Sequence, residues 1–278
     1  MATQYNPNSA ALPSVRIAII GGGPGATEFV HRLNRAVQTE TPVDIQIFEA
    51  RHQFGRGSAW KNNSDSLIAN MRLETLGPSY PHFQIIKDIL AEMGHPEADR
   101  EYPSRNAMGE ALDYRWRQTL AALPSNWRCT ETRATVVDLA PQANGVEILT
   151  DCGTKWPQAN FVVLALGNIP AVPKEADLRA SPRFLPSGWN HAAFDVIGPT
   201  DTVLLKGAGL TALDTTIVLL ERGHQAKAGK IVWQSQSGGL PYVRPRQVPL
   251  DPIFLRPDRS QKKSMNISTA MNRLIYVF

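Results

Sequence analysis

The sequence predicts an α/β fold built from two βαβ units, in each of which a helix joins two parallel strands. Three observations support this prediction. An apolar run with strand character occurs twice, at residues 17–20 and 203–205. A glycine-rich turn follows each run directly, and a stretch with helical periodicity follows each turn. Because parallel strands need a crossover connection, the repeated order of strand, turn and helix predicts a parallel sheet in both units.

The first unit covers residues 15–50. We expect a strand over 15–20, a helix over 28–37 and a second strand over 43–48. The pair Thr41-Pro42 ends the helix, because proline cannot continue the helical hydrogen-bond ladder.

The chain between the two units changes its pattern several times. Residues 51–81 form a long irregular stretch, and loops of this length inside a compact domain usually carry function. The elements expected after it are helices over 83–93 and 106–123, strands within 129–149 with a turn near 141–145, a short buried strand over 161–167 and a proline-rich linker over 169–186.

The second unit begins near residue 200. Its helix is expected over 213–221, with Gly223 as the C-terminal stop, and its closing strand over 231–235. We find no repeat with a solenoid period, so the duplication concerns the βαβ units alone.

Both glycine turns have the pattern that dinucleotides require. The first glycine allows a tight turn, the second lets the backbone approach a pyrophosphate, and a small third residue lets helix and strand pack closely. The phosphates then bind at the helix N-terminus. The candidate residues are Gly21, Gly22, Gly23, Pro24, Gly25 and Ala26 in the first turn, and Gly207, Ala208, Gly209, Leu210, Thr211 and Ala212 in the second.

Glu49 supports the first turn. It lies at the end of the next strand, 23 positions after Ala26, which is close to the usual gap of about 20 residues. A carboxylate there accepts hydrogen bonds from ribose hydroxyls and repels a 2′-phosphate, so this turn suits FAD or NAD better than NADP. The alternative is a glycine-rich turn that binds no ligand.

The second turn lacks such a partner. Its closing strand leads into the uncharged residues 235–239, whereas an NADP site usually offers arginine and an NAD site a carboxylate. Three alternatives stay open. The turn binds NADH loosely, it recruits Arg244 or Arg246 from the next loop, or it has lost cofactor binding.

A loop with glycine, arginine and tryptophan follows Glu49. Such a loop can lie along the pyrophosphate and ring of a flavin, although the same composition is common in ordinary surface loops. Its candidate residues are Arg56, Gly57, Ser58, Ala59 and Trp60.

Taken in order, these motifs resemble those of the FAD/NAD(P)-binding flavoprotein family with two dinucleotide-binding domains. That family is distantly related to the flavin-dependent N-hydroxylating monooxygenases. The resemblance also includes Asn70, residues 165–168 and Asp214. Two features depart from the family: Gln236 and Ser237 replace the usual arginines, and the C-terminal segment that usually completes the FAD domain is short. The short C-terminal segment has three possible explanations. The protein is a trimmed version of the family, its FAD site is partly open, or the sequence is a gene fragment.

The resemblance implies a Rossmann-like FAD-binding domain with a second Rossmann-like NAD(P)-binding domain. We expect a flexible leader over 1–14, the FAD-binding domain over 15–170, a linker over 171–199, the NAD(P)-binding domain over 200–250, whole or incomplete, and a tail over 251–278 that could return to the first domain. The cofactor-binding residues that it implies are the first turn with Glu49 and Ala50; the flavin-lining Arg56, Gly57, Ser58, Ala59, Trp60 and Asn70; Ala165 and Gly167; and Gly207, Gly209, Leu210 and Thr211.

Composition excludes several other classes of protein. A net charge of +4 without concentrated Lys and Arg argues against a nucleic-acid binder. No apolar run approaches the length of about 20 residues that a membrane span needs. Cys129 and Cys152 fit neither a disulfide framework nor a zinc site, so we expect reduced, partly buried thiols in a soluble cytoplasmic protein. The six histidines show no metal spacing.

The expected activity follows from the resemblance. It implies an FAD-dependent oxidoreductase that uses NADH or NADPH to hydroxylate a small-molecule substrate, as a monooxygenase does. The alternatives are a flavin oxidase or dehydrogenase without oxygen insertion, and a truncated, non-catalytic dinucleotide-binding protein. No catalytic side chain is assigned, because the flavin carries the chemistry in such enzymes. The sequence specifies neither the substrate nor the oligomeric state.

Overall fold

The structure is a computed structural model that describes residues 14–50, 54–60, 64–75, 85–153, 156–167, 180–188, 190–224, 229–235 and 238. It divides into two compact units. The first contains the described residues of 14–57 and 112–167, and the second those of 58–111 and 180–238. Residues 58–111, which the sequence grouped with the FAD-binding domain, therefore pack with the second unit. The limits of the FAD-binding and NAD(P)-binding domains stay predictions. The tail over 251–278 lies outside the described residues.

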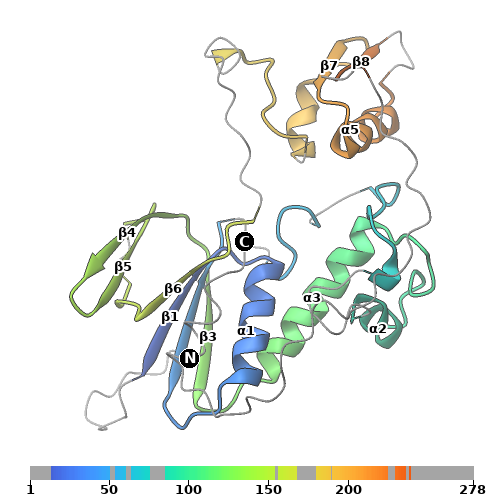
Figure 1. The fold of residues 1–278 in the computed structure, drawn as a ribbon. Helices are drawn as coiled ribbons and strands as arrows, with labels where there is room; N and C mark the ends of the chain where they lie inside the picture. Colours follow the sequence, from blue (N-terminus) through green and yellow to red (C-terminus); the bar gives the residue numbers. More distant parts are fainter. Residues whose placement is uncertain are drawn as a thin grey trace, which may run out of the picture. The chain divides into compact units, whose positions relative to one another are not determined.

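The first unit is built on a four-stranded parallel sheet with the order β3-β2-β1-β6 (Figure 1). Its strands are β1 (Val15–Ile20), β2 (Val43–Phe48), β3 (Trp127–Thr132) and β6 (Phe161–Leu164). Ile20 is paired in register with both Phe48 and Leu164. The residues that follow β1, β2 and β6 are Gly21, Glu49 and Ala165. These three residues therefore meet at the carboxyl edge of the sheet.

Both faces of this sheet are covered (Figure 1). Ile17 and Ile19 of β1 point to one face, where helices α1 (Pro24–Ala36) and α3 (Arg105–Ala121) complete the core. Ala18 and Ile20 point to the other, where the hairpin of β4 (Val136–Gln142) and β5 (Gly145–Thr150) packs. The alternation of side chains along a strand thus gives one strand two separate apolar cores.

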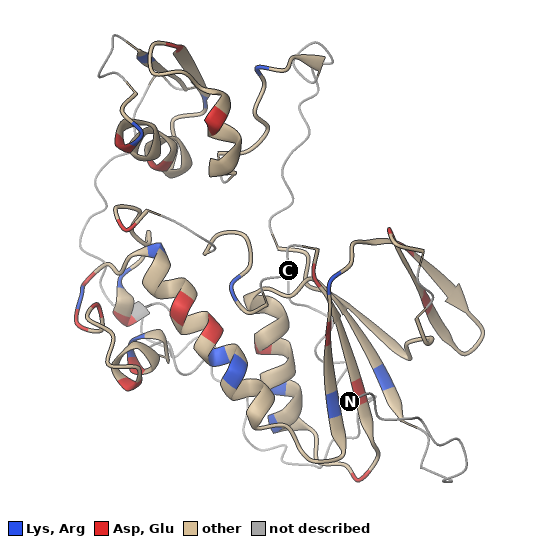
Figure 2. Ribbon diagram, turned by 180° about the vertical axis from the view of Figure 1, so that it is seen from behind, with Lys and Arg blue, Asp and Glu red and all other residues tan. Residues whose placement is uncertain are grey.

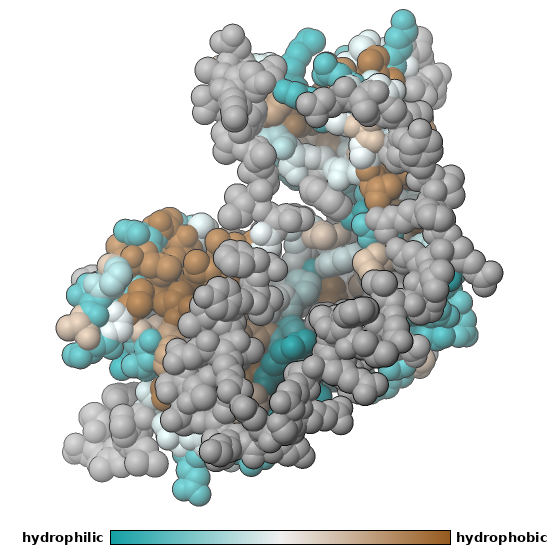
Figure 3. Space-filling view, in the orientation of Figure 1, coloured by the Kyte–Doolittle hydropathy of each residue, from teal (hydrophilic) through white to brown (hydrophobic). Residues whose placement is uncertain are grey.

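The predicted buried strand after residue 160 is only half-buried. Leu164 of β6 is 57% exposed, because β6 is the outer strand of the sheet. Figure 3 shows apolar side chains gathered over the region of β4, β5 and β6. The exposed large apolar residues of this region are Val137, Leu149, Leu164 and Leu166.

The two cysteines differ in their environment. Burial raises the pKa of Cys129, on β3, to about 12, so that thiol stays protonated at neutral pH. Both cysteines are free thiols. The expectation of a partly buried thiol is wrong for Cys152, which is exposed in the turn after β5.

The second unit contains the second βαβ motif. Strands β7 (Thr202–Lys206) and β8 (Lys230–Gln234) are parallel, and α5 (Leu210–Glu221) connects them. Gly223 has a positive φ of 78° and follows the end of α5, as predicted. Both helices begin earlier than predicted, because the turn glycine itself is the N-cap and Pro24 occupies the first turn of α1.

The inserted stretch 58–111 is joined to α5 along one stripe of that helix. It contains the 3-10 helix η1 (Leu73–Thr75), α2 (Ile85–Glu92) and the start of α3. Leu67 packs against Val218 and against Phe194, which belongs to the 3-10 helix η2 (His191–Val196). Ser64 Oγ donates a hydrogen bond of 2.7 Å to Glu221 Oε1. Apolar and polar contacts therefore both hold the insertion to α5.

Charged residues of both signs are interspersed along α3 (Figure 2). Asp113 pairs with Arg56, and Arg115 with Glu28, at N–O distances of 2.6 and 3.9 Å. Within the described ranges, every helix falls short of the length or apolarity that a membrane span needs. The same part of the chain contains no group of three His, Cys, Asp or Glu side chains placed to hold a metal ion.

Candidate functional site

The two glycine turns have nearly the same backbone conformation. Gly21 and Gly207 have positive φ angles of 103° and 109°, which favour glycine. Gly23 and Gly209 are the N-caps of α1 and α5 and are extended, with φ angles of −83° and −87°. The repeated sequence pattern is therefore also a repeated structure.

Both turns place a helix N-terminus at the carboxyl edge of a parallel sheet. Neither α1 nor α5 has an acidic residue in its first turn. The positive end of the helix dipole and the first backbone N–H groups therefore favour an anion such as a phosphate.

Protein packing requires the first two glycines of the first turn. A Cβ atom on Gly21 would collide with the carbonyl oxygen of Ala165, and one on Gly22 would lie 2.8 Å from Phe54 Cδ1. The predicted Ala165 thus contributes to the turn through its backbone.

The loop after Glu49 closes against the same turn. The N–H of Gly55 donates a hydrogen bond of 2.7 Å to the carbonyl of Gly22. A Cβ atom on Gly23 would lie 3.2 Å from the Cα of Gly57. The structure therefore brings the turn and the predicted Gly57 together.

Glu49 is buried directly beside this turn. The residue is 5% exposed, and its Oε2 accepts a hydrogen bond of 2.9 Å from the N–H of Gly22. A carboxylate at the end of β2 is the group that recognises ribose hydroxyls in dinucleotide folds. The first turn and Glu49 thus fit the adenosine and pyrophosphate of FAD, whereas the negative charge disfavours a 2′-phosphate.

Arg56 pairs within the first unit. Its Nε lies 2.6 Å from Oδ2 of Asp113 on α3. This ion pair holds the loop after Glu49 against α3. Ala50 is exposed after Glu49, and Gly167 has a positive φ of 65° beyond β6.

Four predicted flavin-lining residues belong to the second unit, whereas the first turn belongs to the first. They are Ser58, Ala59, Trp60 and Asn70. The guanidinium carbon of Arg105 lies 6.0 Å from the centre of the Trp60 ring, and Asn70 is exposed. Their role at the flavin stays a prediction.

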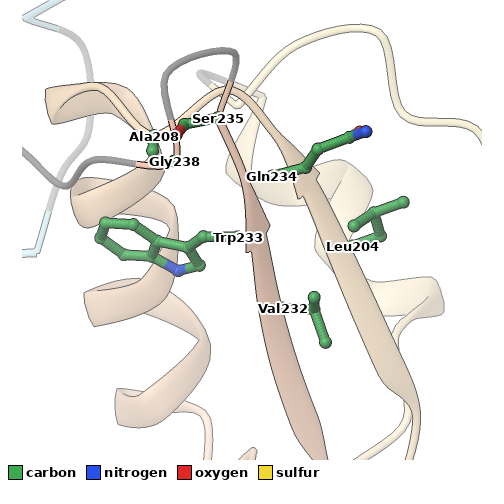
Figure 4. Close-up of a pocket in the computed structure, with 7 residues that line it drawn as sticks. All are labelled: Leu204, Ala208, Val232, Trp233, Gln234, Ser235 and Gly238. Atoms are coloured by element: carbon green, nitrogen blue, oxygen red, sulfur yellow. The ribbon is translucent and has the colours of Figure 1, made fainter.

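Among the described residues, the second turn is open where the first is closed. No described atom lies within 4 Å of a Cβ atom placed on Gly207 or Gly209. A cavity of about 1330 Å³ is lined by these glycines, Thr211 and residues 182–188. A second cavity, of about 450 Å³, lies beside Ala208 (Figure 4). Leu210 is exposed at the first position of α5.

A buried ion pair lies one turn further along α5. Arg105 Nη2 and Asp214 Oδ2 are 2.6 Å apart, with 7% and 12% of the side chains exposed. Burial lowers the pKa of Arg105 and raises that of Asp214, in each case against the attraction of the partner. Sequence reasoning gave this pair no role. One sequence signal could have indicated the pair: Asp214 is the only charged residue of α5 before Glu221 at its end.

These features define a dinucleotide-binding protein: a parallel sheet, two helix N-termini with glycine turns, and a buried carboxylate at one strand end. The chain belongs to the FAD-NAD(P)-binding family, whose model matches residues 18–169. A comparison with curated proteins gave no match.

Solved structures with a similar fold include three oxygenases. The FAD-bound cadaverine monooxygenase of Erwinia amylovora has 12% identity and a TM-score of 0.53, over 78% of this chain and 50% of its own. The lysine monooxygenase of Nocardia farcinica has 15% and 0.51, over 79% and 57%. The S-allyl-L-cysteine S-oxygenase of Allium sativum has 16% and 0.51, over 86% and 55%. The chain thus spans between 50% and 57% of these relatives.

Proposed function

We propose that the chain forms the dinucleotide-binding part of an FAD-dependent monooxygenase, with FAD on the first turn and NADH or NADPH on the second. One observation carries this proposal: the same turn geometry occurs twice, once beside the buried Glu49 and once beside two open cavities. Two dinucleotides in one protein indicate electron transfer between them.

The residues of the chain bind and orient the cofactors. The first turn and the N-terminus of α1 hold the FAD pyrophosphate, and Glu49 holds its ribose. The Arg56–Asp113 ion pair fixes the loop that closes on this turn. A bound FAD would supply the hydride-transfer and oxygen chemistry, while these residues would hold and orient it.

Oxygen transfer to a small molecule is the reaction that we favour. The fold-level likeness to monooxygenases supports this choice as an analogy, since the same fold also serves other chemistries. We place the protein in the cytoplasm, without a nucleic-acid partner. An oxidase or dehydrogenase would use the same two turns and would give no oxygenated product.

The visible spectrum of the purified chain tests the proposal. We expect the flavin absorbance of a yellow protein, or its appearance when FAD is added. Under anaerobic conditions NADH or NADPH should bleach it. A protein that stays colourless with added FAD would contradict the first site, and flavin that neither coenzyme bleaches would contradict the second. Reoxidation that gives only hydrogen peroxide with every substrate tested would favour the oxidase.

Replacing Glu49 should weaken FAD binding. We expect Glu49→Ala to lose about 1–3 kcal/mol of binding free energy, because the ribose hydroxyls lose a charged acceptor. Glu49→Gln should lose less, because its amide oxygen still accepts from Gly22. Titration calorimetry of FAD into the apoprotein measures both.

A matched control lies on the same strand. Asp44, at the other end of β2, forms an ion pair of 2.8 Å with Arg128 on the surface. Asp44→Asn should leave FAD affinity unchanged. An equal loss in the Asp44 and Glu49 variants would show that position at the strand end is irrelevant.

A further inference from the structure

We propose that Arg105 is a positioning residue that links coenzyme binding at the second turn to the side chain of Trp60. The connection is the buried pair that Arg105 forms with Asp214. This inference rests on the proposed function, because the coenzyme is the nicotinamide dinucleotide assigned to that turn. All three residues belong to the second unit.

Arg105 lies where three segments of the second unit meet. It is the first residue of α3, and its backbone N–H donates a hydrogen bond of 2.8 Å to the carbonyl of Leu67. Its guanidinium reaches α5, where Nη2 lies 2.6 Å from Oδ2 of Asp214. The same guanidinium lies 6.0 Å from the centre of the Trp60 ring, which is within the range of a cation–π interaction. One side chain therefore interacts with both α5 and Trp60.

The buried pair is a weak source of stability. Only 7% of the Arg105 side chain and 12% of the Asp214 side chain are exposed. Desolvation lowers the pKa of Arg105 and raises that of Asp214, and in each case it outweighs the attraction of the partner. Apolar residues of similar size often stabilise a protein as well as such a pair does. The pair therefore indicates a role other than stability.

Asp214 is close to the phosphate position expected at the second turn. It follows the N-cap Gly209 by five positions, which corresponds to about 7.5 Å along the helix axis. Side chains on a helix also lean toward its N-terminus. This separation is within the Debye length of about 8 Å at physiological ionic strength, and salt screens buried charges even less. A bound pyrophosphate therefore repels Asp214 and attracts Arg105.

These opposite forces couple the coenzyme to Trp60. The negative charge of the coenzyme competes with Asp214 for the guanidinium of Arg105 and so weakens their pair. A guanidinium that moves toward the phosphate also changes its position over the Trp60 ring. Because binding effects are reciprocal, Arg105 strengthens coenzyme binding and Asp214 weakens it.

Calorimetric titration of the full chain with NAD⁺ and with NADP⁺ tests the two signs. Arg105→Met should weaken coenzyme binding by about tenfold, because it removes the attracting charge. Asp214→Asn should strengthen binding by about tenfold, because it removes the repelling charge. A purely structural role predicts weaker binding in both variants, since both break the same pair.

A pair of the same design at the other end of α5 provides matched controls. Arg222 Nη1 lies 2.7 Å from Oδ1 of Asp195, and the guanidinium carbon of Arg222 lies 5.9 Å from the centre of the Phe194 ring. Arg222 follows Gly209 by 13 positions, or about 20 Å along the axis, which is well beyond the Debye length. Arg222→Met and Asp195→Asn repeat the two charge changes there and should leave coenzyme affinity unchanged.

Fluorine NMR of the full chain labelled with fluorotryptophan reports on Trp60 itself. The variant Trp60→Phe assigns its resonance. Saturating NADP⁺ should shift this resonance in the wild type and in Arg222→Met. The shift should be absent in the double variant Arg105→Met with Asp214→Leu, which leaves neither charge buried alone and so stays folded. Circular dichroism shows that each variant is folded, and the double variant decides if a single variant is not.

The outcomes separate the two proposals. Affinity changes of the same sign in Arg105→Met and Asp214→Asn overturn the role of Arg105. A Trp60 resonance that still shifts in the coenzyme-saturated double variant overturns it as well. A wild type that binds neither coenzyme overturns the second site of the proposed function itself.

Discussion

Replacing Gly209 by valine should abolish binding of the nicotinamide coenzyme while the fold stays nearly as stable. The extended backbone of Gly209 suits any residue, and no described atom lies within 4 Å of the new Cβ. The expected cost in unfolding free energy is about 1 kcal/mol at most, the usual preference for glycine at an N-cap. Coenzyme affinity should fall by about 100-fold or more, because a branched side chain displaces a pyrophosphate from several charge-assisted hydrogen bonds.

Gly207→Val is the matched control in the same turn. Gly207 has a φ of 109°, which strains a β-branched residue, so this variant should lose about 1–3 kcal/mol of unfolding free energy. Denaturant unfolding and coenzyme titration on the same samples separate the two effects. Undiminished coenzyme binding by Gly209→Val would show that no phosphate approaches this glycine. The corresponding test at Gly23 is less selective, because its Cβ would also press on Gly57.

Replacing Asp214 by leucine should lower the free energy of unfolding by about 3–5 kcal/mol. The variant leaves the Arg105 guanidinium buried without the carboxylate that lies 2.6 Å away. Arg105→Met should cost a similar amount for the converse reason. Urea unfolding, monitored by far-UV circular dichroism, measures both.

The double variant distinguishes pairing from packing. Burial shifts the pKa of Arg105 down and that of Asp214 up, so for each charge desolvation outweighs the attraction of its partner. Arg105→Met combined with Asp214→Leu should therefore recover most of the stability lost by either single change. A double variant that loses the sum of the two single losses would show that the charges do not interact.

The strands and the existence of the helices could be predicted from the sequence. The expected strands 15–20 and 43–48 are β1 and β2 as observed, because alternation and buried branched residues define them locally. The predicted starts of α1 and α5 lie a few residues too far along the chain. Apolar periodicity does not show that a glycine of the turn serves as the N-cap.

The site could be predicted where it depends on short spacing. Glu49 was found from its distance to the first turn. The Arg56–Asp113 contact spans 57 residues and the Arg105–Asp214 contact spans 109, and no local pattern specifies such partners. For the same reason the sequence grouped residues 58–111 with the first unit rather than with α5.

The two turns differ in what requires a glycine at each position. Packing against Ala165 and Phe54 keeps Gly21 and Gly22 as glycines even in a protein that no longer binds FAD. Among the described residues, no atom contacts a Cβ atom placed on Gly209, so packing constrains this position less, beyond the usual preference for glycine at an N-cap. Gly21 and Gly22 therefore serve the packing of the first unit, whereas the constraint that we propose for Gly209 is a bound coenzyme.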